Sequence, residues 1–341
     1  MLYRTLGTTG IRISELFLGA MTFGEHGGVG APLAECRSML DAYLDAGGNV
    51  IDTAINYRGG LSEEIVGELL GERRDRFVLA SKYTVSRDPT DPNGGGNHRK
   101  NLRLSLETSL RRLRTDYLDL YWVHIWDDVT PIEQTMRALD DVVRAGKVLA
   151  IGISDTPAWV IARGHTVAEM RDHEQLAAIQ VPYSLVQRDA DRELLPMADA
   201  FGFTIAAWSP LAGGLLSGKF TRGAPPDGTR LDPSGITQQQ RHVAMLVDEI
   251  ADQLGVTSSQ VALAWTMTRH PRLHPIVGAR NLAQLQDNLA AARLTLPDQH
   301  RARLDEATSI DPGFPTDFIA QTKTWVLGAS AVIRPGNEAA G

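Results

Sequence analysis

Four polar side chains stand at or just beyond the ends of apolar runs in the sequence. A buried apolar run needs no ionisable residue at its end for structural reasons. Asp52 closes one run, and Tyr57 follows it by five positions. Lys82 and His124 come at the ends of two further runs. A lysine ammonium within about 4–6 Å of a tyrosine lowers the tyrosine pKa, typically by 1–3 units from about 10. With a carboxylate to hold the lysine and a histidine to position a substrate oxygen, the set predicts a proton donor for a carbonyl oxygen that is becoming an alkoxide.

These side chains can meet only if the runs that carry them are neighbouring strands whose ends share one mouth. Runs typical of buried strands cover residues 16–18, 50–52, 77–81, 118–124, 148–153, 178–181, 203–208 and 274–277. Helical periodicity covers residues 33–46, 63–70, 101–113, 131–145 and 191–200. Apolar strands that each precede a helix indicate a parallel sheet covered by helices. Eight such repeats favour an α/β fold of the closed (β/α)8 TIM-barrel type, although the pattern alone also allows an open doubly wound sheet.

The rest of the chain is organised around this predicted barrel. We expect a single domain over residues 1–341, with the barrel core at about 15–295 and a C-terminal helix and tail at 297–341. Residues 3–12 suggest a small hairpin that caps the barrel, and residues 311–341 read as an irregular tail.

Three connections are unusually long and rich in Gly, Pro or Asp. They cover residues 24–32, 86–97 and 213–234, after the predicted first, third and seventh strands. Connections of this length in a compact domain are usually functional or disordered. In a barrel all three would gather at the C-terminal face, where barrel active sites lie.

The composition excludes several classes of protein. The net charge of −7 argues against a protein that binds a nucleic-acid backbone. A single cysteine, Cys36, excludes an internal disulfide framework and multi-cysteine metal sites, and we expect no metal. Because no apolar run approaches the ~20 residues of a bilayer span and the start of the chain lacks a signal-peptide core, we expect a cytoplasmic protein with no membrane partner. The sequence does not indicate an oligomeric state.

An ordered series of motifs surrounds the four polar residues. The motifs are Leu-Gly-Ala-Met-Thr-Phe-Gly at 18–24, Asp-Thr-Ala-Ile-Asn-Tyr at 52–57, Ser-Lys at 81–82, Asp-Tyr-Leu-Asp-Leu-Tyr-Trp-Val-His at 116–124, Val-Arg-Ala-Gly-Lys-Val at 143–148 and Trp-Ser-Pro-Leu at 208–211. Over about residues 3–310 the chain resembles the aldo-keto reductase family, of the bacterial type and similar to the branch of potassium-channel β subunits. The resemblance implies a barrel that binds a nicotinamide dinucleotide. It also implies that Tyr57 is the general acid, that Lys82 and Asp52 lower its pKa and that His124 orients the carbonyl.

The resemblance also assigns residues to the cofactor. Ser154, Asp155 and Gln180 match positions that hold the nicotinamide carboxamide, with Asp155 where many relatives have asparagine. Trp208 matches an aromatic that stacks on the nicotinamide ring, and the glycine-rich segment 213–219 matches a loop over the pyrophosphate. The predicted cofactor residues are Gly19, Met21, Ser154, Asp155, Gln180, Trp208, Ser209, Leu211, Gly213, Lys219, Gly278, Arg280, Gln284 and Asn288.

The segment after the last predicted strand indicates which dinucleotide is bound. Asn281 is a typical N-cap with Gln284 three residues later, so a helix should begin here and present free amide groups to an anion. Arg280 directly before it adds a guanidinium, and barrel phosphate sites commonly follow strands seven and eight. In the family this segment binds the adenosine 2′-phosphate, with Gln284 and Asn288 at the adenine. We therefore expect NADPH in preference to NADH.

Together these features predict an NADPH-dependent reductase that converts an aldehyde or ketone, a small-molecule carbonyl substrate, to an alcohol. Trp126, Phe314 and Phe318 are the candidates for the substrate pocket. One alternative is a cofactor-binding regulatory subunit that resembles the channel β subunits. A less favoured alternative is a barrel aldolase in which Lys82 forms a Schiff base.

Overall fold

The computed structural model describes residues 1–25, 30–223 and 231–328. Residues 26–29 and 224–230 of two predicted long loops, and residues 329–341 of the predicted tail, lie outside the described part. The chain divides into two compact units, Met1–Thr308 and Ser309–Gly341. The prediction of one domain over the whole chain stays a prediction.

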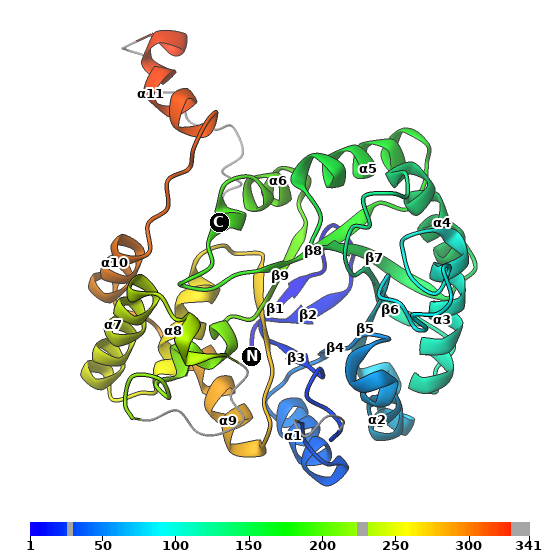
Figure 1. Cartoon of the computed structure of the whole chain (residues 1–341), viewed down its shortest axis with the longest axis horizontal. Helices are drawn as coiled ribbons and strands as arrows, with labels where there is room; N and C mark the ends of the chain where they lie inside the picture. Colours follow the sequence, from blue (N-terminus) through cyan, green and yellow to red (C-terminus); the bar gives the residue numbers. More distant parts are fainter. Residues whose placement is uncertain (26–29, 224–230, 329–341) are drawn as a thin grey trace. The chain divides into compact units, whose positions relative to one another are not determined.

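The first unit is a closed barrel of eight parallel strands in its described residues (Figure 1). The strands are β3 (Phe17–Gly19), β4 (Val50–Asp52), β5 (Val78–Tyr83), β6 (Leu118–Val123), β7 (Val148–Ser154), β8 (Leu176–Pro182), β9 (Thr204–Trp208) and β10 (Leu273–Val277). Each strand pairs with the next in the chain, and β10 closes the barrel against β3. The predicted (β/α)8 fold is confirmed.

Helices surround the barrel in Figure 1. They are α1 (Leu33–Asp45), α2 (Leu61–Leu70), α3 (Arg99–Leu113), α4 (Ile132–Arg144), α5 (Ala158–Met170), α6 (Leu194–Phe201), α7 (Gln238–Leu254), α8 (Ser258–Thr268), α9 (Leu282–Ala290) and α10 (Asp298–Ala307). The predicted start of α9 is confirmed, because Asn281 Oδ1 accepts a hydrogen bond from the Gln284 amide at 2.9 Å. Within the described residues, no helix has both the length and the apolar character needed to cross a bilayer.

The second unit contains a helix that the sequence interpretation missed. The tail was expected to be irregular from residue 311, but α11 spans Thr316–Leu327. This segment holds no glycine or proline and begins directly after Pro315, which leaves its residues free to adopt helical dihedrals.

An antiparallel hairpin of β1 (Tyr3–Thr5) and β2 (Arg12–Ser14) confirms the predicted cap. Its turn packs so closely on the start of β8 that a Cβ at Gly7 would lie 2.3 Å from the Ala177 carbonyl oxygen. Leu6 and Ile13 are fully buried in the cluster that fills the barrel interior. The hairpin therefore closes the N-terminal end of the barrel.

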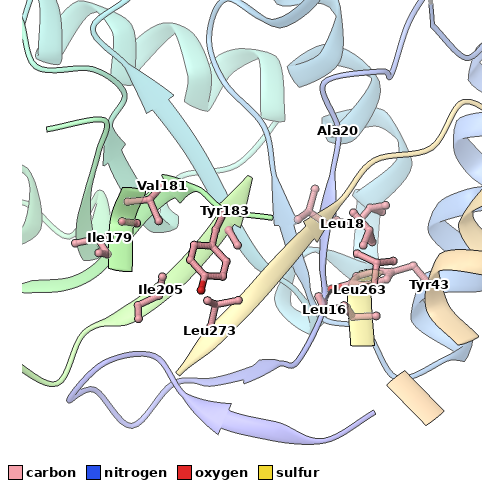
Figure 2. Close-up of a cluster of buried hydrophobic side chains, with 14 of the residues drawn as sticks. Leu16, Leu18, Ala20, Tyr43, Ile179, Val181, Tyr183, Ile205, Leu263 and Leu273 are labelled. Carbon is pink, nitrogen blue, oxygen red and sulfur yellow. Dashed lines mark hydrogen bonds between the residues drawn. The ribbon is translucent and has the colours of Figure 1, made fainter. Parts of the chain in front are cut away.

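Two apolar cores hold the strands in place. One fills the barrel, and the other lies between the strands and the helices, where Figure 2 shows Leu18 of β3, Ile205 of β9 and Leu263 of α8. Because side chains alternate along a strand, Val78 and Ala80 of β5 belong to the barrel interior while the residues between them face the helices. The next inward position on β5 is residue 82, at the C-terminal end of the barrel.

Candidate active site

Polar side chains stand at the C-terminal ends of β4 and β5 and directly after β6, although the inward-facing residues earlier in these strands are apolar. On β5, Lys82 comes two residues after Ala80 and four after Val78, so it faces inward as they do. Asp52 ends the neighbouring β4, and His124 directly follows β6 on the other side. The C-terminal mouth of the barrel thus carries the three ionisable groups that the sequence predicted there.

Lys82 is fully buried and uses all three of its ammonium protons. Its Nζ donates to the Asp52 carboxylate, to the Thr53 carbonyl oxygen at 2.9 Å and to Tyr57 Oη at 3.1 Å. Burial alone would lower the pKa of Lys82, but the carboxylate of Asp52 and the hydroxyl of Tyr57 outweigh it and hold the pKa above its usual value. Lys82 therefore remains a cation that is bonded directly to Tyr57.

Tyr57 comes from a tight turn, Tyr57–Gly60, between β4 and α2. Lys82 Nζ lies 4.7 Å from the centre of the Tyr57 ring. Burial raises the pKa of Tyr57, and the charge of Lys82 offsets only part of that rise. The net direction differs from the lowered pKa expected from the sequence, and the Asp52 carboxylate acts to raise the tyrosine pKa. Tyr57 consequently keeps its proton at neutral pH and can donate it.

His124 lies beside Tyr57, with ring centroids 5.8 Å apart and the planes nearly perpendicular. Burial, followed by the positive charge of Lys82, lowers the pKa of His124 to about 3. The ring is therefore neutral at pH 7 and has one N–H to donate. Its Nδ1 is buried and has no hydrogen-bond partner among the described residues.

Strands β7 and β8 bring the residues that were predicted to hold the nicotinamide carboxamide to the same mouth. Gln180, on β8, donates through Nε2 to Asp52 Oδ1 at 3.1 Å, which links it to the Lys82 group. Its register neighbour on β7, Ser154, has a buried Oγ with no hydrogen-bond partner among the described residues. An unpaired buried hydroxyl costs stability, so it marks a place where a polar ligand group would fit.

Asp155 joins two tryptophans at the rim of this mouth. Its carboxylate accepts a hydrogen bond from Trp208 Nε1 at 3.1 Å, and its carbonyl oxygen accepts one from the Trp126 amide at 3.4 Å. Asp155 has a φ of 43°, in the left-handed region. The Trp126 ring meets Trp159 edge-on, at 6.0 Å between centroids, and Trp159 is 61% exposed. The sequence analysis did not single out Trp159, which lies four residues after Asp155.

The glycine-rich segment after β9 folds back on itself. Gly213 donates from its amide to Ser209 Oγ at 3.3 Å, and Gly214 donates to the Leu211 carbonyl oxygen at 2.8 Å. A Cβ at Gly214 would lie 2.2 Å from Lys219 Nζ, so the lysine packs directly against this turn. The predicted cofactor residues Ser209, Leu211, Gly213 and Lys219 therefore belong to one folded segment, while their contact with a pyrophosphate stays a prediction.

The predicted phosphate site before α9 already holds a protein carboxylate. The Leu282 amide, the first of the helix, donates to the carboxylate of Glu35 from α1. Gln284 Oε1 accepts from the Arg280 amide at 2.9 Å, and buried Asn288 donates to the Gly278 carbonyl oxygen at 3.5 Å. Glu35 could not be found from the sequence, because it lies 247 positions from Leu282.

The remaining predicted residues are spread more widely. Gly19 pairs with Asp52 across β3 and β4, and the Met21 carbonyl oxygen accepts from Arg58 Nε at 3.0 Å. Phe314 and Phe318 belong to the second unit, and their part in a substrate pocket stays a prediction. Across the described ranges, no group of three or more His, Cys, Asp or Glu side chains is placed to hold a metal ion.

Comparison with known proteins identifies the family of the chain. Residues 15–309 match the sequence profile described as Aldo/keto reductase family. The chain belongs to the aldo/keto reductase family.

Three relatives of this aldo/keto reductase come from fungi. It is 36% identical over 331 residues to the norsolorinic acid reductase of Aspergillus flavus, which covers 93% of this chain and 83% of the relative. It is 38% identical over 326 residues to norsolorinic acid reductase stcV of Emericella nidulans, covering 92% and 83%. It is 34% identical over 334 residues to the aryl-alcohol dehydrogenase [NADP(+)] of Phanerodontia chrysosporium, covering 90% and 85%.

Proposed function

We propose that this aldo/keto reductase catalyses the NADPH-dependent reduction of an aldehyde or ketone to an alcohol, with Tyr57 as the general acid. The observation that carries the proposal is the buried chain of hydrogen bonds from Asp52 through Lys82 Nζ to Tyr57 Oη. A protonated tyrosine bonded to a permanent cation suits the donation of a proton to a carbonyl oxygen.

The roles of the four residues follow from their charges. Tyr57 Oη donates its proton to the carbonyl oxygen as that oxygen gains negative charge. Lys82 stabilises the tyrosinate that remains, because its Nζ is already bonded to Tyr57 Oη at 3.1 Å. Asp52 keeps Lys82 charged in a site without solvent exposure. His124, neutral because burial lowers its pKa to about 3, donates a hydrogen bond to the same substrate oxygen.

The residues of the mouth fit a nicotinamide dinucleotide. The orphan hydroxyl of Ser154 and the amide of Gln180 suit a carboxamide, and Trp208, 38% exposed, offers a ring face. When bound, the reduced nicotinamide supplies the hydride for the carbonyl carbon. Arg280 and the start of α9 would hold the 2′-phosphate of NADPH, where Glu35 opposes the added negative charge.

The rim suggests an aromatic substrate. Trp126 and Trp159 place two indoles near Asp155, and exposed aromatic surface next to polar groups is typical of a ligand site. One relative is named an aryl-alcohol dehydrogenase, which supports the same substrate class.

The two alternatives are less favoured. A Schiff-base aldolase needs a neutral lysine with a lowered pKa, whereas Asp52 and Tyr57 hold the pKa of Lys82 above its usual value. A regulatory subunit of the channel type would not require turnover, and the three relatives above are named as reductases and a dehydrogenase.

Two measurements test the proposal. Titration of tryptophan fluorescence with NADPH and with NADH should show quenching and tighter binding of NADPH. Mixing with NADPH and a substituted benzaldehyde should then consume NADPH in proportion to the alcohol formed. Absence of binding for both dinucleotides would contradict the cofactor assignment. Covalent labelling by borohydride in the presence of a carbonyl substrate would favour the aldolase instead.

A further inference from the structure

We propose that the ion pair between the buried Glu63 and the partly buried Arg112 positions the proton donor by fixing the backbone on both sides of the Lys82–Tyr57 hydrogen bond. This inference rests on the proposed function of Tyr57. Glu63 lies on α2 and Arg112 on α3, two helices that pack against each other outside the barrel (Figure 1).

Glu63 acts on the strand that carries Lys82. Its side chain has no solvent exposure, and its Oε1 accepts a hydrogen bond from Ser81 Oγ at 2.6 Å. Ser81 directly precedes Lys82 on β5, and the alternation of the strand turns Ser81 outward toward α2 while Lys82 points into the barrel. The bond therefore fixes the strand at the point where Lys82 emerges.

Arg112 acts on the loop that carries Tyr57. Its Nη1 donates to the Ile55 carbonyl oxygen at 2.9 Å and to the Glu63 carboxylate at 3.3 Å. Its guanidinium also fills the space beneath the turn, because a Cβ at Gly60 would lie 2.3 Å from Arg112 Cζ. One guanidinium thus contacts the chain both before and after Tyr57.

The turn itself needs such support. Arg58, Gly59 and Gly60 have φ values of 53°, 66° and 101°, a run of left-handed conformations. Left-handed backbone at a non-glycine residue such as Arg58 is unfavourable and persists only where the surrounding contacts hold it. A small displacement of this turn would change the separation of Tyr57 Oη and Lys82 Nζ.

An ion pair whose carboxylate is buried is a poor source of stability, which points to another reason for its presence. Desolvation of the buried charge commonly cancels much of the attraction between the partners, and apolar replacements are often equally stable. Here both partners of the pair are instead bonded to segments that flank catalytic residues, Ser81 beside Lys82 and Ile55 beside Tyr57. The ion pair therefore serves to hold Lys82 and Tyr57 in position rather than to stabilise the fold.

Three variants of the full-length chain test the inference. In Glu63→Gln the amide oxygen can still accept from Ser81 but the ion pair is lost, and in Arg112→Gln the bond to Ile55 is weakened. Glu63→Leu combined with Arg112→Met replaces the pair by apolar groups and avoids an uncompensated buried charge. The control is Arg111→Gln, since Arg111 is exposed and donates to Thr108 on the same helix.

We expect kcat to fall in all three variants by roughly 10- to 100-fold, the order of loss that a displacement of about 1 Å produces. The Kd for NADPH should change less than about twofold, and the pH dependence of kcat should shift because the contact of Lys82 with Tyr57 has changed. The apolar double variant should unfold thermally near the temperature of the unchanged protein and still turn over slowly. The control should match the unchanged protein in every measurement.

The outcomes separate this inference from the proposed function. If Tyr57→Phe keeps full turnover, the proposed function fails and the inference fails with it. If Tyr57→Phe is inactive but the folded double variant keeps the original kcat and pH profile, the positioning role alone is wrong.

Discussion

The Asp52–Lys82–Tyr57 group and the β7–β9 side of the barrel mouth differ in how far their charged groups and hydroxyls are already hydrogen-bonded to the protein. Around β4 and β5, Lys82 donates all three ammonium protons to protein acceptors, and the buried Glu63 carboxylate accepts hydrogen bonds from Ser81 and Arg112. Around β7 and β9, Ser154 Oγ is buried without a partner among the described residues, and Trp208 is 38% exposed.

This difference separates the polar groups whose hydrogen bonds the chain supplies itself from those whose hydrogen bonds a ligand would supply. Proton transfer needs fixed distances between charged groups, so the protein builds that side from its own hydrogen bonds. Binding a cofactor needs polar groups that are free to accept it, and an unpaired buried hydroxyl is tolerated where a ligand pairs it. The comparison can be tested by variants that affect one side and spare the other.

Replacing the cation should produce the largest effect. In Lys82→Met we expect turnover to fall by roughly 10²–10⁴-fold, the range for loss of general acid catalysis, because the tyrosinate would lose its counter-charge. The unpaired Asp52 should also lower the free energy of unfolding by about 3–5 kcal/mol. Steady-state kinetics and thermal unfolding measure the two effects.

A double variant separates those two consequences. Asp52→Asn together with Lys82→Met should recover much of the lost stability while turnover stays low. Recovery of turnover along with stability would contradict the role assigned to Lys82.

Acid should weaken the fold through the buried His274 of β10. Burial lowers the pKa of His274 to about 4 in the folded chain, while an unfolded histidine titrates near 6.5. Between these values the unfolded chain binds the additional proton, so His274 lowers the free energy of unfolding by roughly 3 kcal/mol as the pH drops from about 6.5 to about 4, in addition to the contribution of His124. Urea unfolding at several pH values measures this slope, and His274→Leu should reduce it. An unchanged slope in that variant would rule out His274 as the source.

The hydroxyls of two serines allow a matched test of the comparison. Ser154→Ala should weaken NADPH binding by roughly 2- to 13-fold, the equivalent of one hydrogen bond, and leave thermal stability unchanged or slightly higher, because the variant loses a buried hydroxyl that has no protein partner among the described residues. Ser81→Ala should lower thermal stability and leave NADPH binding nearly unchanged, since the Ser81 Oγ donates to buried Glu63. Fluorescence titration and thermal unfolding of both variants measure the two effects. Equal changes in NADPH affinity and thermal stability in the two variants would contradict the difference between the two sides.

The smallest effect should come from the carboxylate at the start of α9. Glu35→Gln removes a negative charge beside the predicted 2′-phosphate site, which is worth about 0.3–1 kcal/mol at a helix N-terminus. NADPH should therefore bind roughly 2- to 5-fold more tightly to the variant, while NADH binding stays the same. An equal gain for NADH would show that the 2′-phosphate does not lie there.

Much of the fold could be predicted because apolar runs of strand length alternate regularly with helices. The position of the four candidate catalytic residues could be predicted for a related reason: Lys82 and His124 are ionisable groups at the ends of otherwise apolar strands. Helix α11 was missed because its exposed apolar residues, such as Trp325, do not form the one-sided pattern of a packed helix.

Other features depend on contacts between distant segments and carry no local signal. Glu63 looks like an ordinary helix residue in the sequence, and its partner Arg112 lies 49 positions away. Glu35 likewise meets α9 only in the folded barrel. The raised pKa of Tyr57 follows from burial, whose extent cannot be judged from the spacing of charged residues.

The most direct test of the central claim is the rate of hydride transfer in Tyr57→Phe, followed as NADPH consumption in a single turnover. Tyr117→Phe is the matched control, because Tyr117 lies away from the mouth and its hydroxyl bonds to Asp75 at 3.1 Å. We predict that Tyr57→Phe binds NADPH normally but loses about 10²–10⁴-fold in rate, while Tyr117→Phe keeps the full rate. A Tyr57→Phe variant that transfers hydride as fast as the unchanged protein would contradict the assignment of the proton donor.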